Sequence, residues 1–352
     1  MEESLILPWP MALAVILAFV SLAVYYTRAH ARRLRRRIRQ QARDLAREFT
    51  LYLDDKISAA DLREASEDAD PGSFWGALEP LAFKLPRQDW IKLSKALDRN
   101  RHSSDEKRAL RDDSPWRAEL ATRRLSLLAS PTSRKALRKA LVSGPELVSF
   151  SAARALARYR DRRALAWLME HPETLKRRST RQWTTLLRLF GTGAYEQLVE
   201  GLDRIEDNPT LERALVEALG HVGDLAAASR IERRLQDSDM NMRAAASRAL
   251  GRMRAIQCAT SLLGALKDEQ WEVRAQAAWA LGRCRAPIAV YSLTTKLTDS
   301  SWWVRRHSAY ALAEMGDDGR EALLNVSENS TDRYARDMAQ EALADGIQQS
   351  AA

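Results

Sequence analysis

The chain has 352 residues, of which 45% are apolar, enough to bury a sizeable core in one or two domains, so a disordered chain is excluded. Two cysteines and five histidines leave no material for a disulfide framework or a Cys/His metal cluster, and no cofactor or metal is predicted. The net charge of +9 alone favours nucleic-acid binding. The charge is unevenly distributed, however, because 101–190 holds 21 basic and 9 acidic residues whereas 191–352 has a net charge of −5.

The first predicted element is an apolar helix over residues 5–26, a run of 22 residues without a charged side chain. As a helix it would be about 33 Å long, which matches a bilayer core. Nine arginines follow in 28–47, and the positive-inside rule then predicts a single-pass inner-membrane protein with anchor 1–27, the N-terminus outside and the repeat domain in the cytoplasm. A bacterial host is expected from the general character of the sequence and not from this rule. A cleaved signal peptide and a buried core helix are the alternatives.

Residues 28–56 are predicted to form a basic helix that continues from the anchor. Leu34, Ile38, Leu45, Phe49 and Leu53 recur at intervals of four and seven, which is typical of a helical stripe. The basic side chains expected beside anionic headgroups are Arg32, Arg33, Arg35, Arg36, Arg37 and Arg39. A short coiled coil or partner helix, and with it a homo-oligomer, is the alternative.

Residues 57–102 form an amphipathic helical adaptor that does not fit the repeat found downstream. Its expected loop covers residues 68–73, and Pro86 is expected to interrupt the helices.

The rest of the chain, 103–345, repeats with a period of 31 residues before a short tail, 346–352. Three blocks that begin at Asp237, Asp268 and Asp299 align without gaps, and the segments between them repeat as well. Each unit therefore consists of two helices, and such units stack because none can bury its apolar face alone. The predicted fold is all-α, an alpha-solenoid of up to eight helix pairs, the first of them degenerate.

The block 268–282 reads D-x-x-W-x-V-R-x-x-A-x-x-A-L-G, a pattern that resembles the HEAT repeat of the short PBS-lyase HEAT-like type. The resemblance implies a structural ladder in which one arginine of each unit pairs with acidic groups between repeats. Its members here would be Arg243, Arg274, Arg305 and Arg336 with Asp237, Asp268 and Asp299. The last unit departs from the pattern, because Ser330 stands where the aspartate would recur. Gly220, Gly251 and Gly282 are expected where the second helices end.

No constellation of catalytic residues is found, so the chain is not expected to be an enzyme. None of the five histidines is followed by glutamate, which separates this chain from the HEAT-repeat deoxyhypusine hydroxylases and their paired His-Glu iron ligands.

A partner-binding surface is predicted on the second helix of each unit, on the face opposite the buried stripe. Trp279 and Tyr310 are expected to be exposed anchors, whereas Trp271, Trp302 and Trp303 are assigned to packing. The predicted partner-binding residues are Arg248, Arg252, Gln276, Trp279, Arg283, His307, Tyr310 and Glu314.

The sequence thus predicts a membrane-anchored cytoplasmic scaffold that binds a membrane-associated protein, as an accessory subunit of a membrane complex. A nucleic-acid-binding solenoid that uses the basic residues of 101–190 is the first alternative, and nucleic acid is not the partner we expect. A bilin-lyase-like protein is the second.

Overall fold

The computed structural model describes the backbone of residues 9–205 and 207–350, and the side chains of 16–205 and 207–345. The described residues are helical with short connections, which confirms the predicted all-α class. The chain divides into two compact units between Ala155 and Leu156, and each is described by itself.

The first unit consists of short helices packed against the C-terminal half of one long helix. Its elements are α1 (Trp9–Leu53), α2 (Ala59–Glu67), α3 (Pro71–Lys84), α4 (Arg87–Ala96), α5 (Arg101–Ala109), α6 (Pro115–Leu125), α7 (Pro131–Ser143) and most of α8 (Glu146–Arg158). The predicted loop ends at Asp70, which caps α3 by accepting a hydrogen bond from the Gly72 amide at 2.8 Å. Pro86 separates α3 from α4, as expected.

The apolar stripe of α1 is used inside this unit. Leu45 and Phe49 are buried, and the Phe49 ring meets Phe74 of α3 edge to face with 6.2 Å between ring centroids. The Ser73 hydroxyl donates to the Ile38 carbonyl at 3.2 Å. The later part of the stripe therefore packs inside this unit, while Leu34 and the six arginines of 32–39 named above are exposed.

The predicted membrane span is not supported by the structure. Its residues 5–8 lie outside the described residues, and side chains are described only from residue 16. Within the described residues, no helix combines the length and the apolar character that crossing a membrane requires. This finding contradicts the predicted single-pass location with the N-terminus outside.

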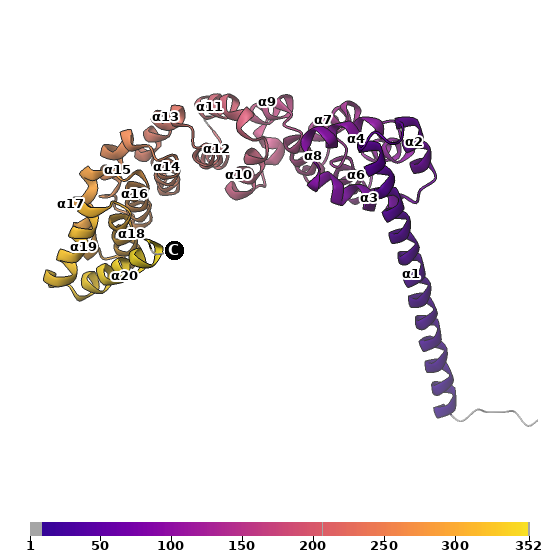
Figure 1. The fold of residues 1–352 in the computed structure, drawn as a ribbon, viewed down its shortest axis with the longest axis horizontal. Coiled ribbons are helices and arrows are strands. Elements are labelled where there is room, and N and C mark those ends of the chain that lie inside the picture. Colours follow the sequence, from indigo (N-terminus) through magenta and orange to yellow (C-terminus); the bar gives the residue numbers. More distant parts are fainter. Residues whose placement is uncertain (1–8, 206, 351–352) are drawn as a thin grey trace, which may run out of the picture. The chain divides into compact units, whose positions relative to one another are not determined.

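The second unit is a stack of helix pairs in which an outer row alternates with an inner row (Figure 1). The outer elements are α9 (Arg162–Glu170), α11 (Tyr195–Arg204), α13 (Ala228–Glu232), α15 (Ala259–Ala265), α17 (Val290–Thr295) and α19 (Asp317–Asn329). The inner helices are α10 (Thr180–Leu189), α12 (Pro209–Val222), α14 (Met240–Met253), α16 (Trp271–Cys284), α18 (Trp302–Ala313) and α20 (Arg333–Ser350).

Short 3-10 turns join these helices. They are η1 (Pro172–Leu175), η2 (Thr192–Ala194), η3 (Leu225–Ala227), η4 (Arg233–Gln236), η5 (Ile256–Cys258), η6 (Pro287–Ala289) and η7 (Lys296–Thr298). The helix that each aligned sequence block predicted is an inner helix, and the segment between blocks is an outer one.

Glycines allow the inner helices to approach closely, and they do not end them as the sequence suggested. Gly220 and Gly282 lie inside α12 and α16. A Cβ atom at either position would lie 2.6 Å from the Cα atom of an alanine in the next inner helix, Ala249 or Ala311. The helices end instead at left-handed residues: Gly223 after α12, and Arg254 and Arg285 after α14 and α16.

Candidate functional site

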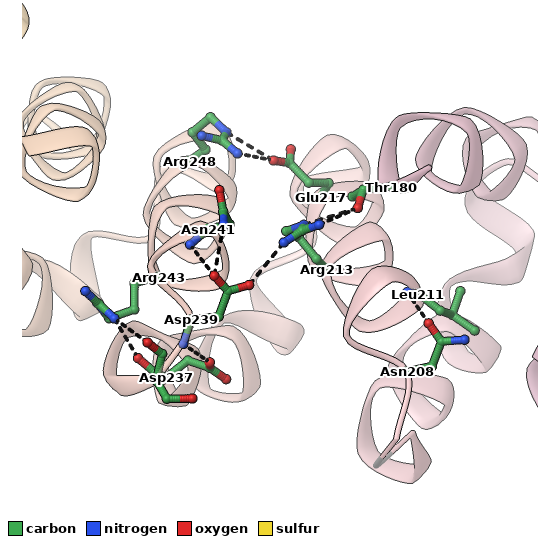
Figure 2. A network of polar contacts seen from close by, with 11 residues as sticks. Thr180, Asn208, Leu211, Arg213, Glu217, Asp237, Asp239, Asn241, Arg243 and Arg248 are labelled. Atoms are coloured by element: carbon green, nitrogen blue, oxygen red, sulfur yellow. Dashed lines mark hydrogen bonds and ion pairs between the residues drawn. The ribbon is translucent and has the colours of Figure 1, made fainter. Parts of the chain in front are cut away.

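An arginine–aspartate ladder joins neighbouring helix pairs of the second unit. Arg243 donates to the carboxylate of Asp268 at 2.7 and 2.9 Å, and Arg274 repeats this geometry with Asp299 at 2.9 and 2.8 Å. Each guanidinium also binds the backbone carbonyls that precede its own helix, so that Arg243 reaches the carbonyl of Asp237 at 2.9 Å. Figure 2 shows that other residues make the preceding step: one period before Arg243 stands Glu212, and Arg213, one residue later, binds Asp239 at 3.1 Å and Thr180 at 2.9 Å.

The ladder stops one unit before the end of the chain. Arg305 keeps the bond to its own backbone, at 2.8 Å to the Asp299 carbonyl, but its buried Nε has no hydrogen-bond partner among the described residues. The aspartate position is Ser330, and Arg336 binds the Ser330 carbonyl at 2.7 Å and no carboxylate among the described side chains.

Five of the eight predicted partner-binding residues are already bonded to side chains of a neighbouring inner helix. Arg248 and Arg252 both bind Glu217, at 2.6 and 2.5 Å. Arg283 lies 3.4 Å from Glu314, and the Tyr310 hydroxyl donates to Asp345 at 2.5 Å. These bonds link positions 31 or 35 residues apart, that is, neighbouring inner helices.

The two arginines lower the pKa of the Glu217 carboxyl, although its burial acts in the opposite direction. Arg248 and Arg252 therefore keep Glu217 ionised. These three side chains form an ion-pair cluster that connects α12 to α14.

The exposure of the aromatic residues is the reverse of the expectation. Trp279 is half-buried, with a ring carbon only 2.7 Å from where a Cβ atom on Gly251 would lie, and Tyr310 is half-buried as well. Trp271, Trp302 and Trp303, which the sequence assigned to packing, are 40%, 44% and 50% exposed. Partner contact through Trp279 and Tyr310 stays a prediction.

A groove of about 860 Å³ crosses five consecutive inner helices, from α10 to α18. Its α10 wall consists of Thr180, Arg181, Thr184, Thr185 and Arg188, and its opposite wall of Trp271, Glu272, Gln276, Trp303 and His307. Arg213, Glu217, Asn241, Ala244, Arg248 and Ala275 lie between the walls. Of the predicted partner-binding residues, the groove therefore contains Arg248, Gln276 and His307, and His307 is fixed by its Nδ1 donating to the Ala275 carbonyl at 3.0 Å.

Comparison of the repeat units explains why the groove is open. Arg213 of α12 and Arg306 of α18 occupy the same position of the 31-residue unit, and at this position α14 and α16 carry Ala244 and Ala275. Two long side chains are thus replaced by methyl groups in the two central helices, and the space that they would fill is open.

The charges that line the groove are uneven. Arg213 and Arg248 are neutralised by Asp239 and Glu217, whereas the exposed guanidinium groups of Arg181 and Arg188 make no hydrogen bond or ion pair to any described residue. On the opposite wall, Oε2 of Glu272 is buried and has no hydrogen-bond partner in the described part of the chain. An unsatisfied buried polar atom costs about 1–3 kcal/mol, so a donor from a bound molecule would be favourable at this oxygen.

Sequence reasoning missed the α10 wall because the α10 unit is one of the degenerate copies. The available signal was the position at which the four aligned inner helices carry Arg213, Ala244, Ala275 and Arg306.

The nucleic-acid alternative would use the basic residues of 101–190, and several of these are engaged within the chain. Arg124 lies 2.6 Å from the buried Glu106, Arg162 binds the Gly193 carbonyl at 2.8 Å, and Arg134, Arg138, Arg177 and Arg178 each have an interaction partner as well. These side chains are therefore not available as a row of free cations.

The comparisons with known proteins support the repeat. A family model of HEAT repeats matches residues 195–266 and 259–344, so this part of the second unit carries HEAT repeats, as predicted. No curated protein was found to match the chain. These matches give no support to the finer assignment to the PBS-lyase type.

Three of the similar solved structures match the chain at low sequence identity. An engineered protein is 21% identical, over 87% of this chain and 94% of that one, with a TM-score of 0.43. Human deoxyhypusine hydroxylase in complex with glycerol is 17% identical over 89% and 97%, with a TM-score of 0.31. Kap121p bound to Nup53p is 16% identical over 86% of this chain and 36% of that one, with a TM-score of 0.40.

Proposed function

We propose that the second unit binds a segment of a partner protein in the groove between α10 and α18, and that the chain is an interaction scaffold without catalysis of its own. The observation that carries this proposal is the exposure of Trp271 and Trp303, 40% and 50%, at the wall of the groove. Tryptophan is enriched where partners dock, because its large ring loses much water-accessible area on binding.

The internal bonding of the inner helices supports the same proposal. Glu217 is paired with both Arg248 and Arg252, so the side chains between the two walls of the groove are held in place before a partner binds. A preformed site loses less conformational freedom on binding than a flexible one. The role of an accessory subunit in a larger assembly, and the resemblance of the 31-residue unit to the PBS-lyase type, belong to this proposal as well.

Site-specific photo-crosslinking tests the proposal in cells. A photoreactive amino acid replaces Thr184 in the groove or, as the control, the exposed Thr260 on the outer helix α15. We expect one discrete protein to crosslink through position 184, to be absent at position 260, and to disappear in the W271A/W303A variant. Equal crosslinking from both positions, or crosslinking at 184 that survives the double variant, would refute a groove-bound partner.

A further inference from the structure

We propose that the occupant of the groove is a segment with a charge at each end: an arginine that docks against Trp271 and Glu272, and an acidic residue that docks between Arg181 and Arg188. This inference rests on the proposed function and specifies the chemistry of the partner.

The arginine end of the segment is inferred from the next inner helix, α18, in which an arginine of the chain itself lies beside the equivalent tryptophan. In α18, Arg306 lies one turn after Trp302 and places its guanidinium 5.4 Å from the centre of that ring and 4.5 Å from that of Tyr310. In α16 the corresponding residues are Trp271 and Ala275, so the tryptophan is present and the arginine is missing. A guanidinium from a partner would fill this position, because cations bind tryptophan faces favourably.

Glu272 supplies the matching negative charge. Its carboxylate lies on the same wall as Trp271, and its buried Oε2 has no donor among the described residues. Arginine fits this pair better than lysine, since its planar group can stack on a ring and donate to a carboxylate at the same time.

The acidic end is inferred from the other wall. Arg181 and Arg188 are exposed on α10, and no described carboxylate pairs with them, in contrast to Arg213 and Arg248 nearby. Three inner-helix spacings of 8–10 Å separate α10 from α16, about 24–30 Å in all. An extended chain covers this distance in about eight or nine residues.

The test selects ligands without assuming their sequence. Random 12-residue peptides displayed on phage are selected on the full-length chain, and the winners are synthesised with a fluorescent label for anisotropy titrations. We expect arginine near one end and aspartate or glutamate about eight residues away. E272Q should weaken binding about tenfold or more, and R181E/R188E should do the same.

A charge swap tests directly whether the acidic residue of the peptide pairs with Arg181 and Arg188. Changing the acidic residue of the peptide to lysine should restore binding to the R181E/R188E variant and weaken binding to the unaltered chain. Matched controls are K267E/R320E and E321Q, which change exposed residues outside the groove and should leave the affinity within about twofold. Melting temperatures of all variants establish that each one is folded.

The outcomes separate this inference from the proposed function. Peptides that lose binding in W271A/W303A but show no charge at their ends, or that are insensitive to E272Q and R181E/R188E, would overturn the inference while the groove remains a binding site. If no selected peptide depends on Trp271 and Trp303, the proposed function itself fails.

Discussion

The guanidinium of Arg274 donates two hydrogen bonds, of 2.9 and 2.8 Å, to the carboxylate of Asp299 in the next helix pair. The same oxygen of Asp299 that Arg274 Nη2 binds also accepts from the Ser301 amide at 3.0 Å. One side chain therefore connects two units and fixes the start of the following inner helix. In the next unit the position of Asp299 is taken by Ser330, whose hydroxyl accepts from the Asp332 amide but carries no charge, and the guanidinium of Arg305 lies over the ring of Tyr334 at 5.3 Å.

Completing the ladder should stabilise the protein. In S330D, a carboxylate can accept from the Asp332 amide as Asp299 accepts from Ser301, and it places a charge opposite the unpaired Nε of Arg305. Charge-assisted hydrogen bonds to buried donors are stabilising, and we expect about 1 kcal/mol in the free energy of unfolding. Urea denaturation followed by circular dichroism measures it. S330N is the control without charge, and an equal or larger gain in S330N would contradict the explanation.

Two helical glycines should respond to alanine in opposite directions. G282A introduces a Cβ atom 2.6 Å from the Cα atom of Ala311, which the stacked helices cannot accommodate without moving apart. We expect a loss of about 2 kcal/mol in the free energy of unfolding, because overpacking outweighs the better helix propensity of alanine.

The matched substitution is G264A in α15, where the added Cβ atom meets nothing within 4 Å. This variant should gain about 0.5 kcal/mol from helix propensity alone. Thermal unfolding of both variants decides the point, and a stable G282A would show that the inner helices are not in close contact at this position.

Two tryptophans of the inner helices should have separable roles. Trp279 packs against Gly251 of α14, so W279A should cost about 2 kcal/mol of stability through the cavity that it leaves. Trp303 is 50% exposed, so W303A should cost less than about 1 kcal/mol while it removes part of the proposed binding wall. Melting temperatures and the crosslinking yield at position 184 measure the two effects. A destabilised W303A with unchanged crosslinking would reverse the assignment.

The ladder should also make the stability of the second unit depend on pH. Hydrogen bonds from Arg243 lower the pKa of Asp268, and those from Arg274 lower the pKa of Asp299 although burial opposes them. Because the folded-state pKa values lie below the unfolded ones, this stabilisation is complete above the unfolded aspartate pKa of about 3.9 and is lost as the pH falls through the lower folded values.

Urea midpoints at pH 7 and pH 3 test this dependence. We expect D268N to be less stable than the unaltered chain at pH 7 and to lose less stability on acidification. E269Q, an exposed neighbour outside the ladder, should show the full loss. Identical pH dependence in D268N and the unaltered chain would exclude the ladder as its source.

The sequence by itself determined the repeat, the helix pairs and the two ladder pairs that form, although Arg305 and Arg336, which it also assigned to the ladder, bind no aspartate side chain among the described residues. These features follow from the 31-residue spacing, because residues one period apart must occupy equivalent positions in stacked units. Even the end of the ladder was visible, as Ser330 in place of aspartate. The apolar run at the N-terminus, in contrast, predicted a membrane span that the described helices do not provide.

Only the tertiary structure decided which side chains of the inner helices remain accessible. Periodicity gives the face of a helix but not what the neighbouring helix places against it. Trp279 is covered because Gly251 admits its ring, whereas Trp271 and Trp303 line the groove and stay 40% and 50% exposed. The groove depends on which residues adjacent inner helices carry at equivalent positions. One of its walls is α10, whose repeat signal is weak, so the groove could be found only from the stacked helices.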